Sequence, residues 1–224
     1  RRVLFRSLRN RTNRNVQASV CGSLRNIVGA EMTRNVWDHW RIPSDNRNRS
    51  RRSSRPKLRG LLMTGPNVDA RSESCGTMAL ATTASGKVTM REAWANIGWR
   101  GDLLDFWDDF SADGKLTARK RPGDADVLMT PGVTGSVAAP VNLPPRGEKT
   151  ATFLVTWHFA NRRSWTPREG AEACCPDFDI VGNYYTEQYR DAWDAAVKTA
   201  GKLNALERDT VKFVRAVCES DAPR

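Results

Sequence analysis

Residues 151–165, with the sequence ATFLVTWHFANRRSW, decide the fold of this chain. An apolar and β-branched run ends at Trp157 and His158, and the residues that follow are polar and basic. The run 150–159 has the length and the Thr, Phe, Val and Trp content of a largely buried strand. We therefore expect one strand of a β-sandwich here, followed by a loop.

The sequence before this strand has the two-residue period of β-structure. Apolar residues alternate in 3–8 and 16–24, and the Asn-rich connection between these runs suits a hairpin. A second hairpin is expected across residues 84–86. Further short strands are predicted at 60–64, 76–83, 87–94 and 136–143. Short strands separated by turn residues favour an antiparallel β-sandwich over a parallel α/β sheet.

The sequence after residue 182 has a helical period instead. One face of a first helix is expected to carry Tyr185, Tyr189, Trp193, Val197 and Ala200. Gly201 would end this helix, and Asn204 with Glu207 would cap a second one. The apolar stripe of the second helix would comprise Leu206, Thr210, Phe213, Val214 and Val217. We therefore expect a sandwich domain over 1–183 and a helical linker over 184–224, whose apolar faces need a partner surface.

Composition sets bounds on the class of protein. The chain has 224 residues, of which 39% are hydrophobic, and this is enough for one sizeable core. No apolar run approaches the roughly 20 residues of a membrane helix, although contact with a membrane stays open. The five Cys show no CxxC spacing, which favours reduced thiols in the cytoplasm over a disulfide framework or a zinc site.

Several segments resemble, in the same order, the N-terminal domain of glycoside hydrolase family 116, the bile-acid β-glucosidase or non-lysosomal glucosylceramidase group, and its bacterial members in particular. They are VCGSLRNIVG at 20–29, GTMALATT at 76–83, LLDFWDDFSADGKL at 103–116, TFLVTWHFANRRSW at 152–165 and VGNYYTEQYRDAWDAA at 181–196. The resemblance implies a large β-sandwich, with the acid/base and nucleophile carboxylates in a separate α-helical barrel further along the polypeptide.

The resemblance also implies a role for the chain. It is expected to be a fragment that lacks the start of the sandwich, and its partner would be the missing C-terminal catalytic barrel of the same polypeptide. The intact enzyme would hydrolyse β-glucosides, glucosylceramide-like lipids among them, in carbohydrate metabolism. No cofactor is implied.

The segment 102–114, DLLDFWDDFSADG, is the main candidate for carboxylate chemistry because it holds five Asp and no basic residue. A helix here would place Leu104, Trp107 and Phe110 on one side. The other side, towards solvent, would carry Asp105, Asp108 and Asp109. Retaining glycosidases need two carboxyl groups about 5–5.5 Å apart, one with a pKa raised by burial. Clustering in sequence does not supply that environment, so we interpret the segment as a solvated surface.

The junction of strand and loop supplies the candidate contact residues, which are Trp157, His158, Arg162, Arg163 and Trp165. His158 is one of two histidines in the chain, and a hydrogen-bonded structural role is the favoured interpretation. The Arg and Trp side chains could line a sugar-binding rim, because Trp rings stack on sugars and Arg bridges hydroxyls. An interdomain loop is the favoured alternative. No catalytic, cofactor-binding or metal-binding residue is predicted.

Positive charge is concentrated at the start of the chain. Residues 1–59 hold 16 Lys and Arg against 3 acidic residues, whereas the remainder holds 20 against 22. Segment 43–57, PSDNRNRSRRSSRPK, has no apolar residue and is predicted to be a mobile basic loop. An alternative function is a nucleic-acid-binding module acting through residues 47–59, since clustered Arg neutralises phosphates. The absence of interleaved aromatic residues disfavours nucleic acid as a partner.

Overall fold

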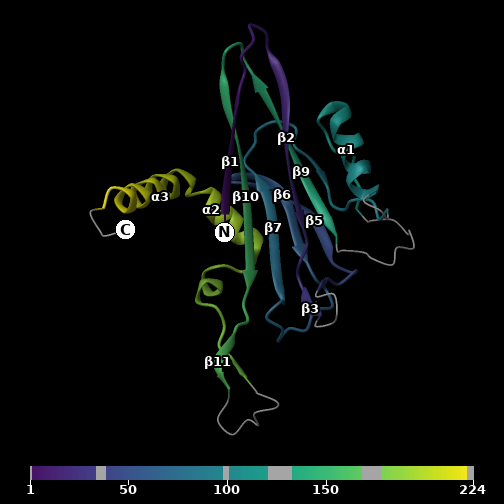
Figure 1. The fold of residues 1–224 in the computed structure, drawn as a ribbon, viewed down its shortest axis with the longest axis vertical. Helices are drawn as coiled ribbons and strands as arrows, with labels where there is room; N and C mark the ends of the chain where they lie inside the picture. The colour runs from purple at the N-terminus through teal and green to yellow at the C-terminus, as the bar shows by residue number, and fades with distance from the viewer. Residues whose placement is uncertain (1, 34–38, 98–100, 121–132, 168–177, 221–224) are drawn as a thin grey trace.

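The fold was analysed in a computed structural model, which describes residues 2–33, 39–97, 101–120, 133–167 and 178–220. Antiparallel strands build the body of the molecule, and helices lie on its outside (Figure 1). The predicted fold class, a mainly β antiparallel sandwich followed by C-terminal helices, is confirmed.

The larger sheet has five strands, all antiparallel to their neighbours, in the order β1-β10-β7-β6-β5. These strands are β1 (Arg2–Arg9), β10 (Glu148–Phe159), β7 (Gly76–Thr82), β6 (Lys57–Thr64) and β5 (Arg47–Ser54). Residues 151–159 of the quoted stretch therefore lie in β10, with β1 on one side and β7 on the other. Residues 163–165, predicted as loop, begin the short strand β11.

The smaller sheet has three strands in the order β2-β9-β8. They are β2 (Val16–Arg25), β9 (Thr134–Leu143) and β8 (Thr89–Arg91). Two short ribbons complete the β-structure, one of β3 (Glu31–Thr33) with β4 (His39–Arg41) and one of β11 (Arg163–Pro167) with β12 (Phe178–Ile180). The β11 ribbon extends beyond one end of the sandwich, at the bottom of Figure 1.

The main core lies between the two sheets. The larger sheet contributes Leu61, Met63, Met78, Leu80 and Phe153. The smaller sheet faces them with Val137, Ala139, Val141 and Leu143. The alternation of these positions along each strand follows from the pleat, which sends successive side chains to opposite faces.

Helices cover the outer faces of the sandwich. The helix α2 (Ala192–Ala200) packs on the larger sheet, where Ala196 is buried with Leu58, Ala81 and Leu154. The helix α1 (Gly101–Asp113) packs on the outer face of the smaller sheet. Because β10 is covered by the core on one face and by α2 on the other, its sequence is a nearly continuous apolar run.

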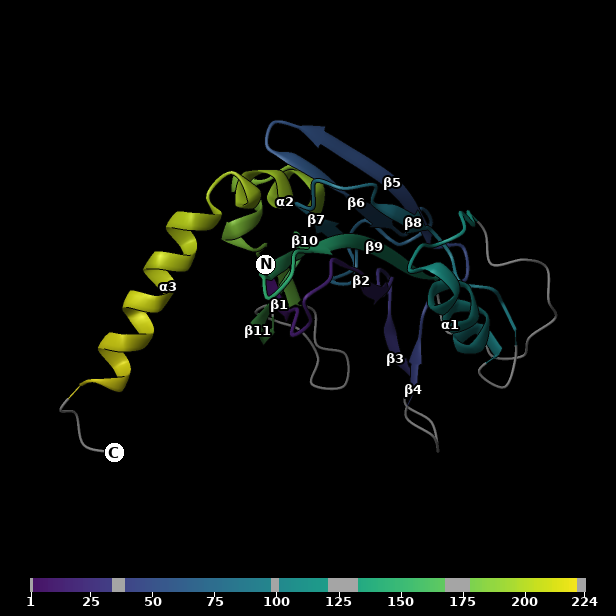
Figure 2. The same ribbon diagram turned by 90° about the horizontal axis from the view of Figure 1, so that it is seen from above.

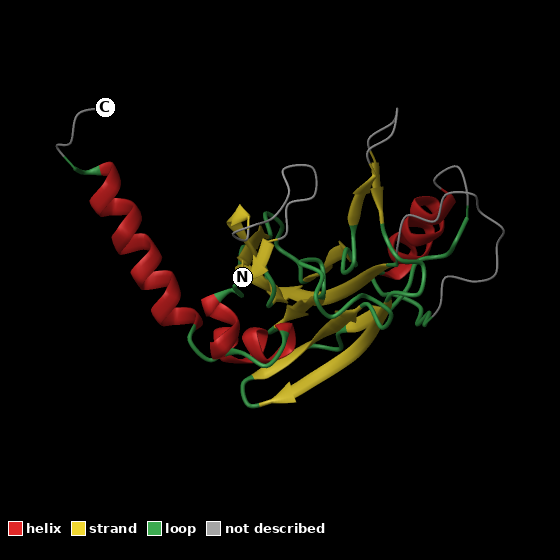
Figure 3. Ribbon diagram, turned by 90° about the horizontal axis from the view of Figure 1, so that it is seen from below, coloured by secondary structure: helices red, strands yellow, loops and turns green. Residues whose placement is uncertain are grey.

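The last helix, α3 (Leu203–Cys218), has no buried residue and projects away from the sheets (Figures 2 and 3). Within the described ranges, no helix combines the length and the apolar character that crossing a membrane requires.

The predicted hairpins are wrong, although strands lie in each predicted segment, with the one predicted at 87–94 reduced to Thr89–Arg91. Segments 3–8 and 16–24 lie in different sheets, because β1 pairs with β10 and β2 pairs with β9. The strands β7 and β8 are likewise divided between the two sheets. Turn residues show where the chain reverses but not which sheet it enters next.

The connection 10–15 between β1 and β2 is held to the β9–β10 turn by the side chain of Asn10. Its Nδ2 donates to the carbonyl oxygens of Leu143 and Pro144.

The predicted mobile loop at 43–57 is also wrong, because residues 47–54 form β5, paired in register with β6. As an edge strand, β5 satisfies half of its backbone groups through β6 and needs almost no apolar side chains. Its one buried side chain, Asn48, donates to the carbonyl oxygens of Glu92 and Val133. The sequence also predicts an exposed loop at 119–135, from its Gly and Pro-Gly breaks, and residues 121–132 of it lie outside the described residues.

The predicted first C-terminal helix is shorter than expected. Residues 184–188 form a single 3-10 helix, η1 (Tyr184–Gln188), after which Tyr189 is extended. Asp191 caps α2, because its side chain accepts a hydrogen bond from the Asp194 backbone N–H. The capping prediction for the second helix is wrong, since α3 begins at Leu203 and Asn204 already lies within it.

Candidate functional site

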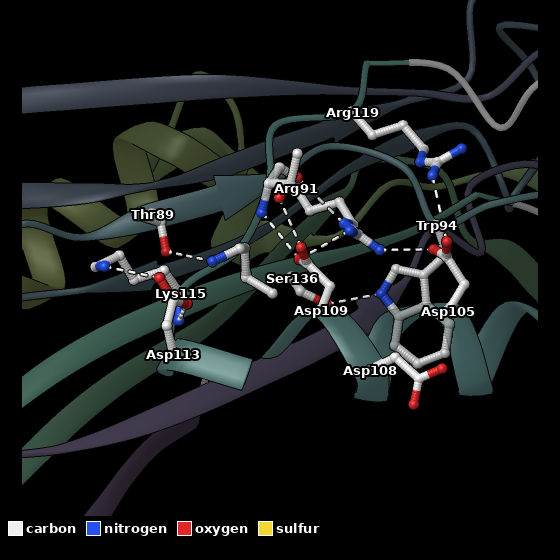
Figure 4. A network of polar contacts seen from close by, with 12 residues as sticks. Thr89, Arg91, Trp94, Asp105, Asp108, Asp109, Asp113, Lys115, Arg119 and Ser136 are labelled. Carbon is white, nitrogen blue, oxygen red and sulfur yellow. Dashed lines mark hydrogen bonds and ion pairs between the residues drawn. The ribbon is translucent and has the colours of Figure 1, made fainter. Parts of the chain in front are cut away.

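The acidic helix α1 is held by a buried arginine. Arg91, on β8, is only 2% exposed, and its Nη1 lies 2.8 Å from an oxygen of Asp105. Its Nη2 lies 2.8 Å from an oxygen of Asp109, one helical turn further on (Figure 4). The i,i+4 spacing of the two carboxylates thus presents both to one guanidinium.

All four oxygens of these two carboxylates accept hydrogen bonds or ion pairs. The second oxygen of Asp105 lies 3.4 Å from Nη2 of Arg119. Asp109 accepts from the backbone N–H of Thr117 at 2.9 Å and from its hydroxyl at 2.6 Å. The Arg91 Nε completes the network by donating to the Thr117 carbonyl at 3.2 Å. These contacts fix α1 and the segment after it to β8.

The predicted orientation of α1 is therefore wrong for two of the three Asp expected to face solvent, since Asp105 and Asp109 face inward. Phe106 is buried and stacks on Trp94, with ring centroids 4.5 Å apart, while Leu104 is 63% and Trp107 57% exposed. The helical spacing of the apolar residues is compatible with either face of α1 packing on the sheet. The buried charge of Arg91 selects the face that carries its counter-ions.

His158 and Trp157 point to opposite faces of the larger sheet, because they are neighbours on β10. The His158 Nε2 lies 2.8 Å from the carbonyl oxygen of Tyr189 and 3.3 Å from that of Thr186. Carbonyl oxygens only accept, so Nε2 carries the proton in this arrangement. The Tyr185 ring packs edge-on against the imidazole, and its hydroxyl bonds to both backbone groups of Phe159. His158 thus joins η1 to β10.

The remaining candidates lie at the β11 ribbon. Arg162 and Arg163 are exposed at its base, and Trp165 is 93% exposed on the ribbon itself. The backbone N–H of Arg163 donates to the Glu73 carboxylate at 2.8 Å, which anchors the base of the ribbon to the β6–β7 connection. Trp157, on the sheet, is 39% exposed.

The five candidate residues are not joined into one site. Over the described residues, no hydrogen bond, ion pair or ring contact links any two of them. In the same part of the chain, no three His, Cys, Asp or Glu side chains gather where they could hold a metal ion. The arrangement offers exposed aromatic and guanidinium groups for contact.

Two features escaped the sequence interpretation. The Arg91 clamp could have been found from a lone Arg in the short strand run 87–94 combined with an Asp pair at i,i+4 spacing. The other feature is the exposure of α3, where Phe213 is 69%, Val217 57% and Val214 49% exposed. The sequence predicted this apolar stripe but could not show that the sandwich leaves it uncovered.

Comparison with protein families gives one match that covers most of the chain. A family model described as beta-glucosidase 2, glycosyl-hydrolase family 116 N-term, matches residues 3–206. The match includes both sheets, α1 and α2, and it ends within the first turn of α3. No curated protein matches the chain.

Proposed function

The chain belongs to the N-terminal domain family of glycosyl hydrolase family 116, and on this premise we propose that it is the non-catalytic sandwich of an enzyme that hydrolyses β-glucosides. The two acidic groups of the reaction then come from a catalytic α-barrel of the same polypeptide. The substrates include glucosylceramide-like lipids.

The main support for the proposal is that the carboxylate oxygens of Asp105 and Asp109 are bound by other residues of the domain. Glycosidases work with a pair of carboxyl groups that both reach the scissile bond. Of the three Asp considered as glycosidase carboxylates, Asp105 and Asp109 have all their oxygens bound by Arg91, Arg119 and Thr117, and Asp108 lies exposed on α1. A structural role for the pair leaves the chemistry to another domain.

The surface proposed to contact the catalytic barrel is the apolar stripe of α3. Leu206, Phe213, Val214 and Val217 lie at helical spacing on this helix, and none of them is buried. Burial of such side chains stabilises an interface by about 25 cal/mol per Å² of apolar surface removed from water. Apart from Leu203 at its start, which packs against the cluster of Leu58, Ala81, Leu154 and Ala196, no residue of α3 belongs to a hydrophobic cluster of the described residues. The stripe therefore has this stabilisation still available for a partner.

The β11 ribbon supports a contribution to the substrate rim. Trp165 exposes nearly its whole indole ring, and Arg162 and Arg163 expose their guanidinium groups beside it in sequence. Trp faces stack on sugar rings, and Arg donates to hydroxyl groups. His158 is excluded from this role because its Nε2 is bound to backbone carbonyl groups.

The free thiols of Cys21, Cys75 and Cys218 fit a reducing compartment such as the cytoplasm.

The test compares the intact polypeptide with variants of the α3 stripe. Phe213→Ser with Val217→Ser should lower β-glucoside hydrolysis at least tenfold, because the barrel loses its contact with the sandwich. The matched control is Arg208→Ser with Lys212→Ser, which changes exposed residues away from the stripe and should alter the rate less than twofold. Unchanged hydrolysis in the stripe variant would contradict the proposed contact.

A further inference from the structure

The edge strand β5 and the adjacent end of β6 carry a dense group of basic side chains. We call this group the arginine edge, and it consists of Arg47, Arg49, Arg51, Arg52, Lys57 and Arg59. The sequence interpretation placed these residues in a mobile loop, where their relative positions would be undefined. The pairing of β5 with β6 instead fixes them in an ordered hairpin that projects beside α2 (Figure 2).

Three of the arginines form a row on one face of β5. Arg47, Arg49 and Arg51 occupy alternate positions, and their partners on β6 are Thr64, Leu62 and Gly60. Leu62 packs against Ala192 of α2, so the row lies on the same face of the sheet as α2, which covers the neighbouring strands. The Cα atoms of successive arginines in the row lie about 6.7 Å apart along the strand, and all three residues are exposed. The row is a regular, linear array of positive charge.

The opposite face of the hairpin brings like charges together. Arg52 pairs directly across the strands with Arg59, and Lys57 lies at the end of the same hairpin. Like charges at directly opposed positions destabilise a sheet. Arg59 and Lys57 donate only to the backbone carbonyl groups of Gly86 and Ser85. Among the described residues, no carboxylate pairs with any member of the arginine edge, so its charge is left for an external anion.

The backbone of β5 argues against an acidic peptide that adds a strand to the sheet. Strand addition needs free N–H and C=O groups along the edge. The N–H of Ser50, in the middle of β5, already donates to the Glu92 carboxylate at 2.7 Å. Recognition at this edge therefore falls to the side chains, and Arg side chains bind phosphate oxygens through paired N–H donors.

We propose that the arginine edge binds the phosphodiester backbone of nucleic acid without sequence preference. The absence of aromatic side chains within the edge excludes base stacking there and leaves phosphate contacts alone, which carry no sequence information. This activity does not rest on the proposed glycosidase role, because it uses side chains of β5 and β6 and none of α3 or the β11 ribbon. It is driven by release of counterions and falls steeply as salt rises.

The test measures fluorescence anisotropy of a labelled oligo(U) with the 224-residue chain at 50–200 mM salt. The edge variant combines Arg47→Gln, Arg49→Gln and Arg51→Gln. The control variant combines Arg9→Gln, Arg11→Gln and Arg14→Gln, which removes the same charge from exposed arginines near the β1–β2 connection. At 100 mM salt, the edge variant should bind at least tenfold more weakly than the parent and the control less than threefold. The salt slope of the edge variant should fall by about 2, since three phosphate contacts are lost.

Three results would overturn the proposal. One is an equal loss of affinity in the edge and control variants, which would mean that only net charge matters. Another is no saturable binding by the parent at 50 mM salt. The third is competition by poly-glutamate as strong as by oligo(U), which would assign the edge to acidic polypeptides. A variant with Arg47→Lys, Arg49→Lys and Arg51→Lys should keep its affinity within about threefold, and thermal melting of each variant checks that β5 remains folded.

Discussion

Single residues determine how the helices sit on the sandwich. Arg91 is buried and charged, and it turns α1 so that Asp105 and Asp109 face the sheet while Leu104 and Trp107 face outward. The sequence predicted the helix but not its orientation. The spacing of apolar residues along the helix carries no information about a buried charge on a separate strand. The favoured interpretation of His158 as a hydrogen-bonded residue agrees with its contacts to the carbonyl groups of Thr186 and Tyr189.

The Arg91 clamp predicts a specific loss of stability. Asp109→Ala leaves the buried guanidinium with one carboxylate and also removes the partner of Thr117, so the free energy of unfolding should fall by roughly 2–3 kcal/mol. Asp108→Ala changes an exposed neighbour on the same helix and should alter it by less than about 0.5 kcal/mol. Urea denaturation of both variants measures the difference. Equal stability in the two variants would show that the clamp contributes nothing.

Asp194 predicts a pH dependence of stability. Burial acts to raise its pKa, but hydrogen bonds from Lys198 Nζ and the Arg190 N–H, with the charges of both residues, outweigh burial and lower the pKa. A carboxyl whose pKa is lowered on folding stabilises the protein above its unfolded pKa of about 4, and this contribution is lost as the pH falls through the folded pKa. The melting temperature of the parent should therefore fall more between pH 5 and pH 3 than that of Asp194→Asn. Parallel pH profiles would show that Asp194 is not responsible.

At the scale of elements, the sequence predicted where strands lie better than how they pair. The strands at 60–64, 76–83, 136–143 and 150–159 are confirmed, because period and composition are local properties. Pairing depends on contacts between distant segments, and the predicted hairpins were wrong for this reason. The basic strand β5 was missed since an edge strand needs no apolar face, and its pairing with β6 supplies the missing stabilisation.

The packing of α2 against β10 gives a prediction for an element. Ala196 has no exposed surface and contacts Leu58, Ala81 and Leu154, so Ala196→Leu would force α2 away from the sheet. The expected loss is roughly 1–3 kcal/mol in the free energy of unfolding. Ala216→Leu, the same change on the exposed helix α3, should cost less than about 0.5 kcal/mol. Chemical denaturation compares the two, and an equal loss would place α3 against a surface of the domain.

At the scale of the whole molecule, the architecture is two sheets between two helices, with α3 and the β11 ribbon extending from it (Figure 2). The family was identifiable from ordered sequence segments, and the family match confirms it over residues 3–206. The candidate contact surface was only partly predictable. The sequence identified Trp165 and the α3 stripe as candidates, but only the fold shows that both are exposed.

The central proposal is that the catalytic carboxylates of the glycosidase lie outside this sandwich, and the most direct test is hydrolysis of a chromogenic β-glucoside by the purified 224-residue chain. We predict no release of chromophore above the buffer blank at any pH from 4 to 8, because Asp105 and Asp109 are bound by Arg91. Turnover that is abolished by Asp105→Asn or Asp109→Asn would contradict the account and place the catalytic carboxylates on α1.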